Sequence, residues 1–334
     1  MPLPFLNAGG APGSLWPVTN LAGTPYALSQ GVGRLISLGD SHTLALDYGV
    51  SLTQHYPYLA ASILGWRSYN FGISGNTTAQ MLSRIATTMQ YGVPAVATVY
   101  GKTNDNYTVT TVAESPAPTS TTFSISSNSD RYTSSEGGWI TVDGELAQIQ
   151  SVSGAEITLT SPLTSGAPTA GDAVMVDAVK NLSEITAYWQ GQGVSRIVVL
   201  QQHYLNWASG GDTTSAENVS AAASRAEQLE AALAMGVAPL SLYTYMRQLI
   251  VDGAYTQGDD LAWHVGIGNS HLNATGHAVL AAALVACIVA QEWIVAAPSG
   301  AIAWEGDEVG NYWALAGDEA GYLVLEGDEA GARP

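Results

Sequence analysis

Short apolar strands alternate with longer helical segments through most of this chain, and no other feature restricts its fold as strongly. The segments with the length and apolar content of strands are 35–38, 67–71, 96–100, 196–200 and 239–242. The segments with helical patterns lie near 50–64, 78–90, 177–192, 215–234, 243–252 and 274–296. Strands that alternate with helices build βαβ units, whose strands pair in parallel. We therefore predict an α/β fold of three layers, with a doubly wound parallel sheet between two layers of helices.

Polar motifs occur where these predicted strands end or where helices begin. In chain order they are Gly39-Asp40-Ser41-His42, Ser74-Gly75-Asn76-Thr77, Thr103-Asn104-Asp105 and Ser270-His271-Leu272-Asn273. A serine at a strand-to-loop corner can present its hydroxyl to a substrate, and a late histidine can take the proton of that hydroxyl. The amides of a glycine and an asparagine can converge on an oxyanion. Together the motifs predict the chemistry of acyl transfer.

Each motif taken alone also has a purely structural interpretation. Asp40 or Ser41 could cap the next helix, and Gly75 could be a turn glycine. Asn104 lies in ordinary loop composition, and His271 could lie in a loop that enters a helix. Turns and caps do not explain why all of the motifs follow strands or precede helices in one order. The joint catalytic interpretation is therefore favoured.

In this order the motifs resemble those of the SGNH, or GDSL-type, hydrolase superfamily, which is named after its functional serine, glycine, asparagine and histidine. The resemblance covers residues 34–297 with one large interruption. It implies a flavodoxin-like core, carboxylic ester hydrolysis, and no metal or cofactor. Carried over residue by residue, it makes Ser41 the nucleophile and His271 the general base. It also makes Ser41, Gly75 and Asn104 the oxyanion donors, the first two through backbone N–H groups and the third through its side-chain amide.

The sequence departs from the family pattern just before the histidine. The superfamily places an aspartate three residues ahead of it, and here that position holds Gly268. Two alternatives stay open: a main-chain carbonyl orients the imidazole of His271, or Asp259 or Asp260 reaches it from the preceding loop. We favour the carbonyl, because adjacent aspartates in a Gly-Asp-Asp loop are typical of solvated turns.

A second departure lies in the third motif, where the family pattern is glycine, any residue, asparagine, aspartate. Gly101 stands one position too early, because Lys102 and Thr103 separate it from Asn104. A bulge at the strand end could absorb the extra residue. Lys102 could contact an anionic substrate, although a solvated surface lysine is the more common situation.

The alternation of strands and helices stops between residues 107 and 175, which are rich in Ser and Thr. Alternating strands are predicted at 122–125, 139–142 and 156–160, with turn signals such as Asp143-Gly144 between them. We predict a small all-β domain at 107–175, inserted between the two parts of a hydrolase core at 31–106 and 176–297. This insert could cap the pocket, bind polysaccharide, contact a neighbouring subunit or be a structural decoration.

The two ends of the chain differ from this core. Residues 1–30 form a Gly- and Pro-rich arm that lacks the basic and long apolar regions of a signal peptide. Residues 298–334 carry a repeat, whose units are Glu305-Gly306-Asp307-Glu308, Ala316-Gly317-Asp318-Glu319 and Glu326-Gly327-Asp328-Glu329. Each unit has too few oxygen ligands for a calcium loop, so short strands linked by Gly-Asp turns are predicted. The repeat resembles the ends of bacteriophage virion structural proteins, which implies a particle-associated enzyme that acts on bacterial surface glycans.

Charge and composition limit the classes of molecule that this protein is expected to bind. The 10 basic and 28 acidic residues give a formal net charge of −18, which argues against nucleic acid or an anionic membrane as partner and favours neutral substrates. The single cysteine, Cys287, cannot form an internal disulfide and is expected in the core. Polar residues interrupt the apolar run 278–297, which favours a buried helix over a membrane span. A homo-oligomer and virion partner proteins stay open, as do locations in the virion and in the cytoplasm before release.

The leading functional hypothesis is a serine esterase that removes O-acetyl groups from carbohydrate. Its substrate would be an acylated small molecule or an acetylated polysaccharide. One alternative is a glycan-binding virion structural protein with weak or no catalysis, which Gly268 and the displaced Gly101 favour. The other alternative is a lipase or thioesterase that acts on acyl chains.

Overall fold

A parallel sheet forms the centre of the computed structural model, which describes residues 33–201, 203, 216–254, 263–265, 271–291, 293, 313–317 and 323–327. The sheet has five strands, and every pair of neighbours runs parallel. The strands are β1 (Arg34–Gly39), β2 (Arg67–Gly72), β3 (Val96–Tyr100), β10 (Ile197–Gln201) and β11 (Ala238–Ser241). Each strand lies within about one residue of its predicted position.

The strand order across this sheet is β11-β10-β3-β1-β2. The chain moves from β1 to one side and then reverses to the other, as in flavodoxin-like sheets. In such sheets the ligand crevice forms where the order reverses, here at the carboxyl ends of β1 and β3. Strands β1, β3 and β10 are almost wholly buried, which explains their continuous apolar sequences. The predicted α/β fold class is confirmed.

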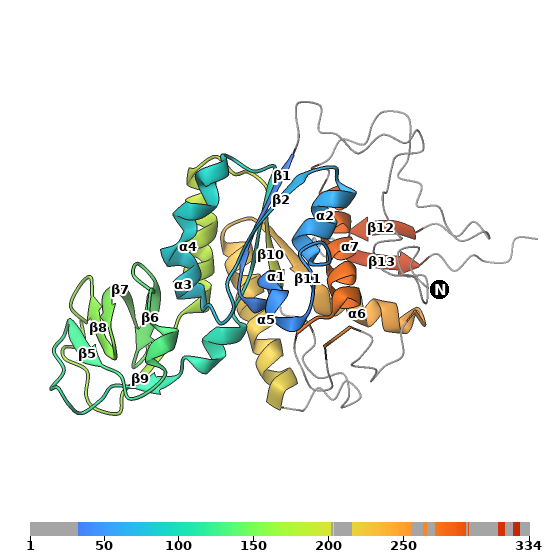
Figure 1. The fold of residues 1–334 in the computed structure, drawn as a ribbon. Coiled ribbons are helices and arrows are strands. Elements are labelled where there is room, and N and C mark those ends of the chain that lie inside the picture. The colour runs from blue at the N-terminus through green and yellow to red at the C-terminus, as the bar shows by residue number, and fades with distance from the viewer. Residues whose placement is uncertain are drawn as a thin grey trace, which may run out of the picture.

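Helices cover both faces of the sheet (Figure 1). One layer holds α2 (Tyr56–Ile63), α6 (Leu242–Val251) and α7 (Ala274–Ala290), and the other holds α3 (Thr78–Ser83), α4 (Ala178–Gly191) and α5 (Ala216–Ala234). Side chains alternate along each strand, so Val96 and Tyr100 of β3 pack with the first layer, and Ala97 and Val99 pack with the second. The sheet therefore separates two hydrophobic clusters.

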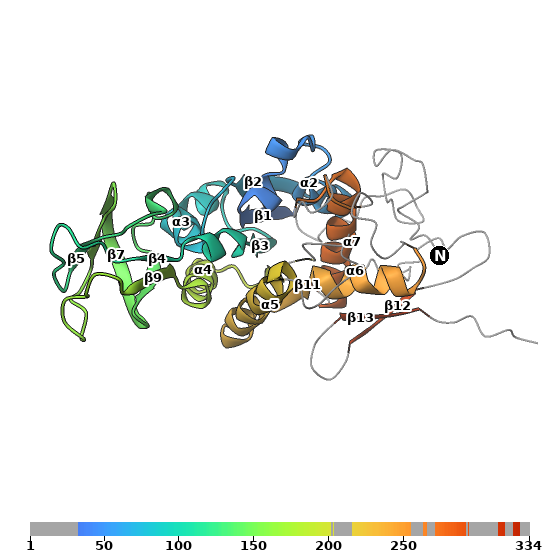
Figure 2. The same ribbon diagram turned by 90° about the horizontal axis from the view of Figure 1, so that it is seen from below.

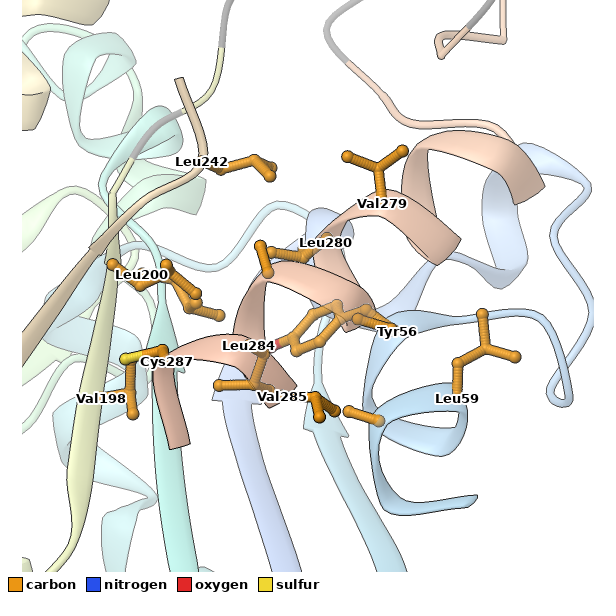
Figure 3. Packing of buried hydrophobic residues seen from close by; sticks show 14 of the residues in the cluster. Tyr56, Leu59, Val198, Leu200, Leu242, Val279, Leu280, Leu284, Val285 and Cys287 are labelled. Atoms are coloured by element: carbon orange, nitrogen blue, oxygen red, sulfur yellow. The ribbon is translucent and has the colours of Figure 1, made fainter. Parts of the chain in front are cut away.

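Helix α7 is buried at every position from Gly276 to Ile288. Leu280, Leu284 and Cys287 lie toward Val198 and Leu200 of β10 in the same cluster (Figure 3). Burial of one leucine side chain contributes about 1.5–3 kcal/mol, so this helix is a main part of the core. The predicted core helix is confirmed, and Cys287 is a free, buried thiol. Nowhere in the described part of the chain does a helix combine the length and hydropathy needed to cross a membrane.

Two helices are shorter than their sequence patterns predict. In segment 50–64, α2 begins only at Tyr56, where the His55 side chain accepts the Tyr58 N–H and a proline occupies the first turn. Proline is tolerated there because its missing N–H would have no partner in the helix. In segment 78–90, α3 ends at Ser83 and a 3-10 helix, η3 (Ile85–Tyr91), follows it.

Residues 110–176 form a second, six-stranded antiparallel sheet beside α3 and α4 (Figure 2). Its strands are β4 (Thr110–Thr111), β5 (Thr122–Ser124), β6 (Trp139–Val142), β7 (Glu145–Ser153), β8 (Glu156–Leu159) and β9 (Ala173–Val176). The first strand pairs with the last, so the two ends of this segment lie side by side, as an inserted unit requires. Asp143 and Gly144 have φ angles of 48° and 81°, which suit the tight hairpin turn predicted between β6 and β7.

This sheet, called the insert below, has a buried cluster of its own. Phe123, Ile140, Ile149 and Ile157 belong to it, and Ala79 of α3 joins it from the core. The insert also contacts α4, where the Asn181 side chain accepts the Trp139 N–H and donates to the Trp139 carbonyl. That the insert folds as a separate domain stays a prediction.

The C-terminal repeat includes two strands, β12 (Trp313–Gly317) and β13 (Leu323–Gly327), which pair antiparallel (Figure 2). These strands lead into the second and third Gly-Asp-Glu units, in agreement with the prediction of short strands. The first unit, the arm 1–30 and the residues Asp259, Asp260 and Gly268 lie outside the described residues.

Candidate active site

Ser41 and His271 meet although 230 positions separate them in the sequence. The Ser41 Oγ lies 2.8 Å from the Nε2 of His271, which is hydrogen-bond distance. Ser41 is the first residue of α1 (Ser41–Leu44), and the side chain of Asp40 caps this helix by accepting the His42 N–H. Gly39 makes the sharp turn possible, because a side chain there would lie 2.5 Å from the Tyr100 carbonyl. The capping interpretation of this motif is therefore confirmed for Asp40, and the catalytic role of Ser41 stays a prediction with which the short distance to His271 is compatible.

Main-chain contacts fix the position of His271. Leu272 forms a β-bridge with His264, and the Val265 N–H donates to the His271 carbonyl over 3.0 Å. Asn273 caps α7 by accepting the Gly276 N–H, and its side-chain amide donates to the His264 carbonyl. These bonds hold the backbone of His271 between residues 264–265 and the start of α7.

Aromatic rings surround the imidazole of His271. Tyr48, from the 3-10 helix η2 (Leu46–Tyr48), stacks on it with ring centroids 3.4 Å apart. His42 stacks on it at 4.7 Å, and His203 lies edge-on to His42 at 5.0 Å. His203 in turn stacks with His264 at 5.5 Å. Within the described residues, this histidine cluster does not have the arrangement of a metal site.

Burial favours the neutral form of His271 and of His42. The pKa of His271 is lowered to about 4, first by burial and then by nearby His264, while Asp47 acts in the opposite direction. The pKa of the fully buried His42 is also well below its usual value, first because of burial and then because of His203 and His271. At neutral pH the His271 ring is therefore unprotonated, which is the state that a general base needs.

The predicted oxyanion donors gather around Ser41. Among the described residues, none accepts a hydrogen bond from the backbone N–H of Ser41 or Gly75, so both N–H groups are available to a substrate oxygen. The Asn104 Nδ2 donates to the Asn76 carbonyl over 3.0 Å and to Asp40 Oδ2 over 3.3 Å. Asn104 thus bridges the serine turn and the Gly75 loop. A substrate oxyanion would replace the longer of these two bonds, the one to Asp40.

Two buried carboxyl groups support these loops. Burial raises the pKa of Asp40 to about 7 and that of Asp105 to about 6. Asp105 accepts from the Thr78 N–H over 2.8 Å and from the Thr78 hydroxyl over 2.5 Å, and so ties the Asn104 loop to the start of α3. Asp105 is therefore a structural partner of the site.

The extra residue in the third motif is accommodated without a bulge in the described strand pairing. Lys102 takes a positive φ of 111° directly after β3, and the 3-10 helix η4 (Thr103–Tyr107) begins behind it. The expected roles of Lys102 in substrate contact or as a solvated lysine are wrong. Its side chain is only 9% exposed and its Nζ lies 2.7 Å from Glu227 of α5, because that helix covers the end of β3.

Two arginines hold the Gly75 loop, and the motifs gave no sign of either. Arg84, which follows α3, donates to the Gly39 carbonyl, the Phe71 carbonyl and the Asn76 side chain over 2.7–2.9 Å. Arg131, in the 3-10 helix η5 (Ser129–Arg131) of the insert, donates through Nη1 to the Gly75 carbonyl over 3.0 Å. The same Nη1 lies 3.4 Å from Asn104 Oδ1. Arg131 lies in a Ser- and Thr-rich segment where no local pattern marks it.

The group that orients His271 stays a prediction, because Asp259, Asp260 and Gly268 lie outside the described residues. Asp47 is a carboxylate that no sequence motif indicated, and it lies close enough to raise the pKa of His271. Its only sequence signal is its position on the loop that follows the nucleophile.

Comparisons with known proteins find structural neighbours of low sequence identity. No protein-family model matches the sequence, and no curated protein matches it. The structure is similar to that of Axe2, an acetylxylan esterase from Geobacillus stearothermophilus, with 14% identity, a TM-score of 0.48, and coverage of 81% of this chain and 100% of the other. It is similar to a lipolytic G-D-S-L family protein from Veillonella parvula, with 13% identity, a TM-score of 0.43, and coverage of 75% and 96%.

It is also similar to LAE5, an α/β hydrolase enzyme from the metagenome of Lake Arreo, with 14% identity, a TM-score of 0.46, and coverage of 79% and 97%. Because the identities and the TM-scores are low, the geometry of the site itself remains the basis for a functional assignment.

Proposed function

We propose that this protein is a serine esterase of the SGNH type, and that it removes acetyl groups from carbohydrate, with bacterial surface glycans as its target. The hydrogen-bond distance between Ser41 Oγ and His271 Nε2 carries the proposal. A solvated or merely capping serine has no need of a neutral imidazole at 2.8 Å. The pair has the arrangement of an activated nucleophile and its base.

The reaction follows from the placement of these groups. Ser41 Oγ attacks the ester carbonyl while His271 Nε2 takes its proton. The N–H groups of Ser41 and Gly75 and the Nδ2 of Asn104 stabilise the negative oxygen that forms. His271 then gives the proton to the sugar oxygen that leaves, which becomes a free hydroxyl. Water next attacks the acetyl group on Ser41 while His271 takes its proton, and His271 returns that proton to Ser41 Oγ as acetate is released.

The choice of substrate rests on charge and on the family resemblance. A protein of net charge −18 repels anionic substrates, which favours a neutral, acetylated sugar. One observation favours the second candidate, a lipase or thioesterase. Leu46 and Leu52, on either side of Tyr48, are 44% and 60% exposed and could contact an acyl chain.

Labelling with a fluorophosphonate tests for an activated serine without requiring the natural substrate. We expect one label per chain on the wild-type protein and on Ser62→Ala, a matched change at an exposed serine of α2. Ser41→Ala should not be labelled and should not hydrolyse 4-nitrophenyl acetate.

The natural substrate is tested by comparing acetate release from acetylated glycans with hydrolysis of 4-nitrophenyl esters of increasing chain length. Acetate release supports the carbohydrate esterase, and a preference for long chains supports the lipase. An unlabelled wild-type protein that binds glycan would leave the inactive virion protein as the correct interpretation.

A further inference from the structure

We propose that Arg131, a side chain supplied by the insert, is a positioning residue of the oxyanion hole. The inference rests on the proposed function, since it concerns the same site. If it is correct, the insert contributes a residue to the active site and is not only a structural addition to the core.

A single nitrogen of Arg131 joins two predicted oxyanion residues that come from different loops. Its Nη1 donates to the Gly75 carbonyl over 3.0 Å and lies 3.4 Å from the side-chain oxygen of Asn104. Gly75 lies behind β2 and has a φ of 75°, and Asn104 lies behind β3. The guanidinium therefore fixes the spacing between two groups that must point at the same substrate oxygen.

The contact also strengthens Asn104 as a donor. A cation that lies against the amide oxygen draws electron density away from Nδ2, so its N–H groups donate more strongly. It also makes the amide face one way, with its oxygen toward the insert and its nitrogen toward the serine turn. A flipped amide would offer the oxyanion an acceptor instead of a donor.

The backbone around Arg131 is anchored to the helix that follows the Gly75 loop. The Gln80 side chain of α3 donates to the Thr133 carbonyl over 2.7 Å, and Ser83 donates to the Ser134 carbonyl over 2.6 Å. Thr77, which caps α3, lies 3.5 Å from the Arg131 carbonyl. These bonds do not involve the guanidinium, so they hold the insert in place when the Arg131 side chain is changed.

Arg131 differs from Arg84, the other arginine at this loop. Arg84 is largely buried and its three donors hold the ends of β1 and β2 from within. The side chain of Arg131 is 30% exposed, and among the described residues its ion-pair partner is Asp130, whose Oδ2 lies 3.5 Å from Nε. A positive charge at this place in an otherwise acidic protein also favours the negative charge that forms on the substrate.

The test replaces Arg131 with methionine, which keeps the length of the side chain but removes its donors and charge, and with lysine, which keeps the charge. Lys180→Met, in α4, is the matched control, since it removes a cation whose partner is Glu184. We would measure kcat and KM for 4-nitrophenyl acetate, the inhibition constant of a trifluoromethyl ketone that forms an oxyanion adduct with Ser41, and the melting temperature.

For Arg131→Met we expect kcat to fall about tenfold with KM changed less than about twofold, a smaller loss than removal of a donor itself would cause. The ketone should bind about tenfold more weakly, and Arg131→Lys should restore part of both losses. A structural role would lower the melting temperature without moving kcat and the ketone affinity together.

Unchanged kcat in Arg131→Met, or a change confined to KM, would overturn the inference while leaving the esterase proposal intact. Failure of both variants to fold would also overturn it, because Arg131 would then be a structural residue. Fluorophosphonate labelling of the wild-type protein separates the two proposals: an unlabelled wild type rejects both, and a labelled one leaves the Arg131 variants to decide.

Discussion

In the parallel core, neighbouring strand ends place Ser41 and the predicted oxyanion donors, whereas the insert contacts the same loops through the guanidinium of Arg131. The register pairs Gly39 of β1 with Gly72 of β2 and with Tyr100 of β3. Ser41, Gly75 and Asn104 follow these paired ends within a few residues. Backbone pairing therefore determines where the core groups meet, and only side-chain contacts determine where Arg131 lies.

Because the two regions are held in different ways, we expect substitutions in them to affect the catalytic rate differently. Strand pairing holds the core groups by many buried contacts, so removing one of them should cost activity without moving its neighbours. The insert is held by hydrogen bonds at η5, by its contact with Ala79, and by the buried Asn181 side chain of α4, which bonds the Trp139 backbone. Changes in the insert should therefore alter the rate by smaller factors.

The largest effect among the following changes is expected for a core donor. Asn104→Ala should lower kcat by ~10²–10³, the loss typical of one oxyanion donor. Asn106→Ala is the matched control on the same 3-10 helix, where the amide donates to Ser224 of α5 over 3.2 Å and faces away from the site. The check is kcat for 4-nitrophenyl acetate with both variants folded. An unchanged rate in Asn104→Ala would remove this residue from the oxyanion hole.

A smaller effect is expected when the insert is removed. Deletion of residues 107–175, with a short Gly-Ser linker between the cut ends, should leave a folded core, because β4 and β9 bring those ends together. The rate should fall about tenfold, as for Arg131→Met, because the core groups remain. Circular dichroism and kcat of the deletion variant provide the check. Insoluble protein would show that the insert shares the main core. A loss of kcat as large as that of Asn104→Ala would show that the insert and the core contribute equally to catalysis.

The sequence predicts the parts of the molecule that depend on local pattern. The apolar runs of β1, β3 and β10 and the turn glycine Gly75 could be placed because burial and backbone conformation leave direct marks on composition. The pairing of Ser41 with His271 followed from the motif order, although the contact spans 230 positions.

The rest of the site depends on tertiary contacts that leave no local mark. Arg131 lies 56 positions from Gly75, and the stack of Tyr48 on His271 joins the two ends of the core. Lys102 was misjudged because only the covering helix α5 buries it. Strands β7 and β9 of the insert were not predicted, although β9 alternates exposed and buried positions; in β7 an irregular pairing at Ile149 and Ser151 interrupts that alternation.

A smaller effect is expected when a charge near His271, the predicted general base, is removed, and it should appear in the pH dependence of kcat/KM. Because the pKa of His271 is lowered to about 4, kcat/KM should hold from neutral pH down to about pH 5 and fall by half near pH 4. Asp47 raises that pKa, so Asp47→Asn should move the acid limb to lower pH, by a small amount because Asp47 is exposed. Asp143→Asn, in an exposed turn of the insert, is the charge-matched control. An acid limb near the ordinary histidine pKa would contradict the burial of His271.

The smallest effects are expected at the loop before the histidine, and they would show whether a main-chain group or a side chain orients His271. We predict that a main-chain carbonyl orients His271, so Asp259→Asn and Asp260→Asn should each leave kcat almost unchanged. Gly268→Asp, which restores the family aspartate, should raise kcat if the backbone there accepts a side chain, because a carboxylate stabilises the imidazolium that forms during attack. Steady-state kinetics of the three variants, with melting temperatures as the control for folding, provide the check. A large loss of kcat in either Asp→Asn variant would instead identify the third member of a triad, and the core base would then depend on a side chain just as the insert does through Arg131.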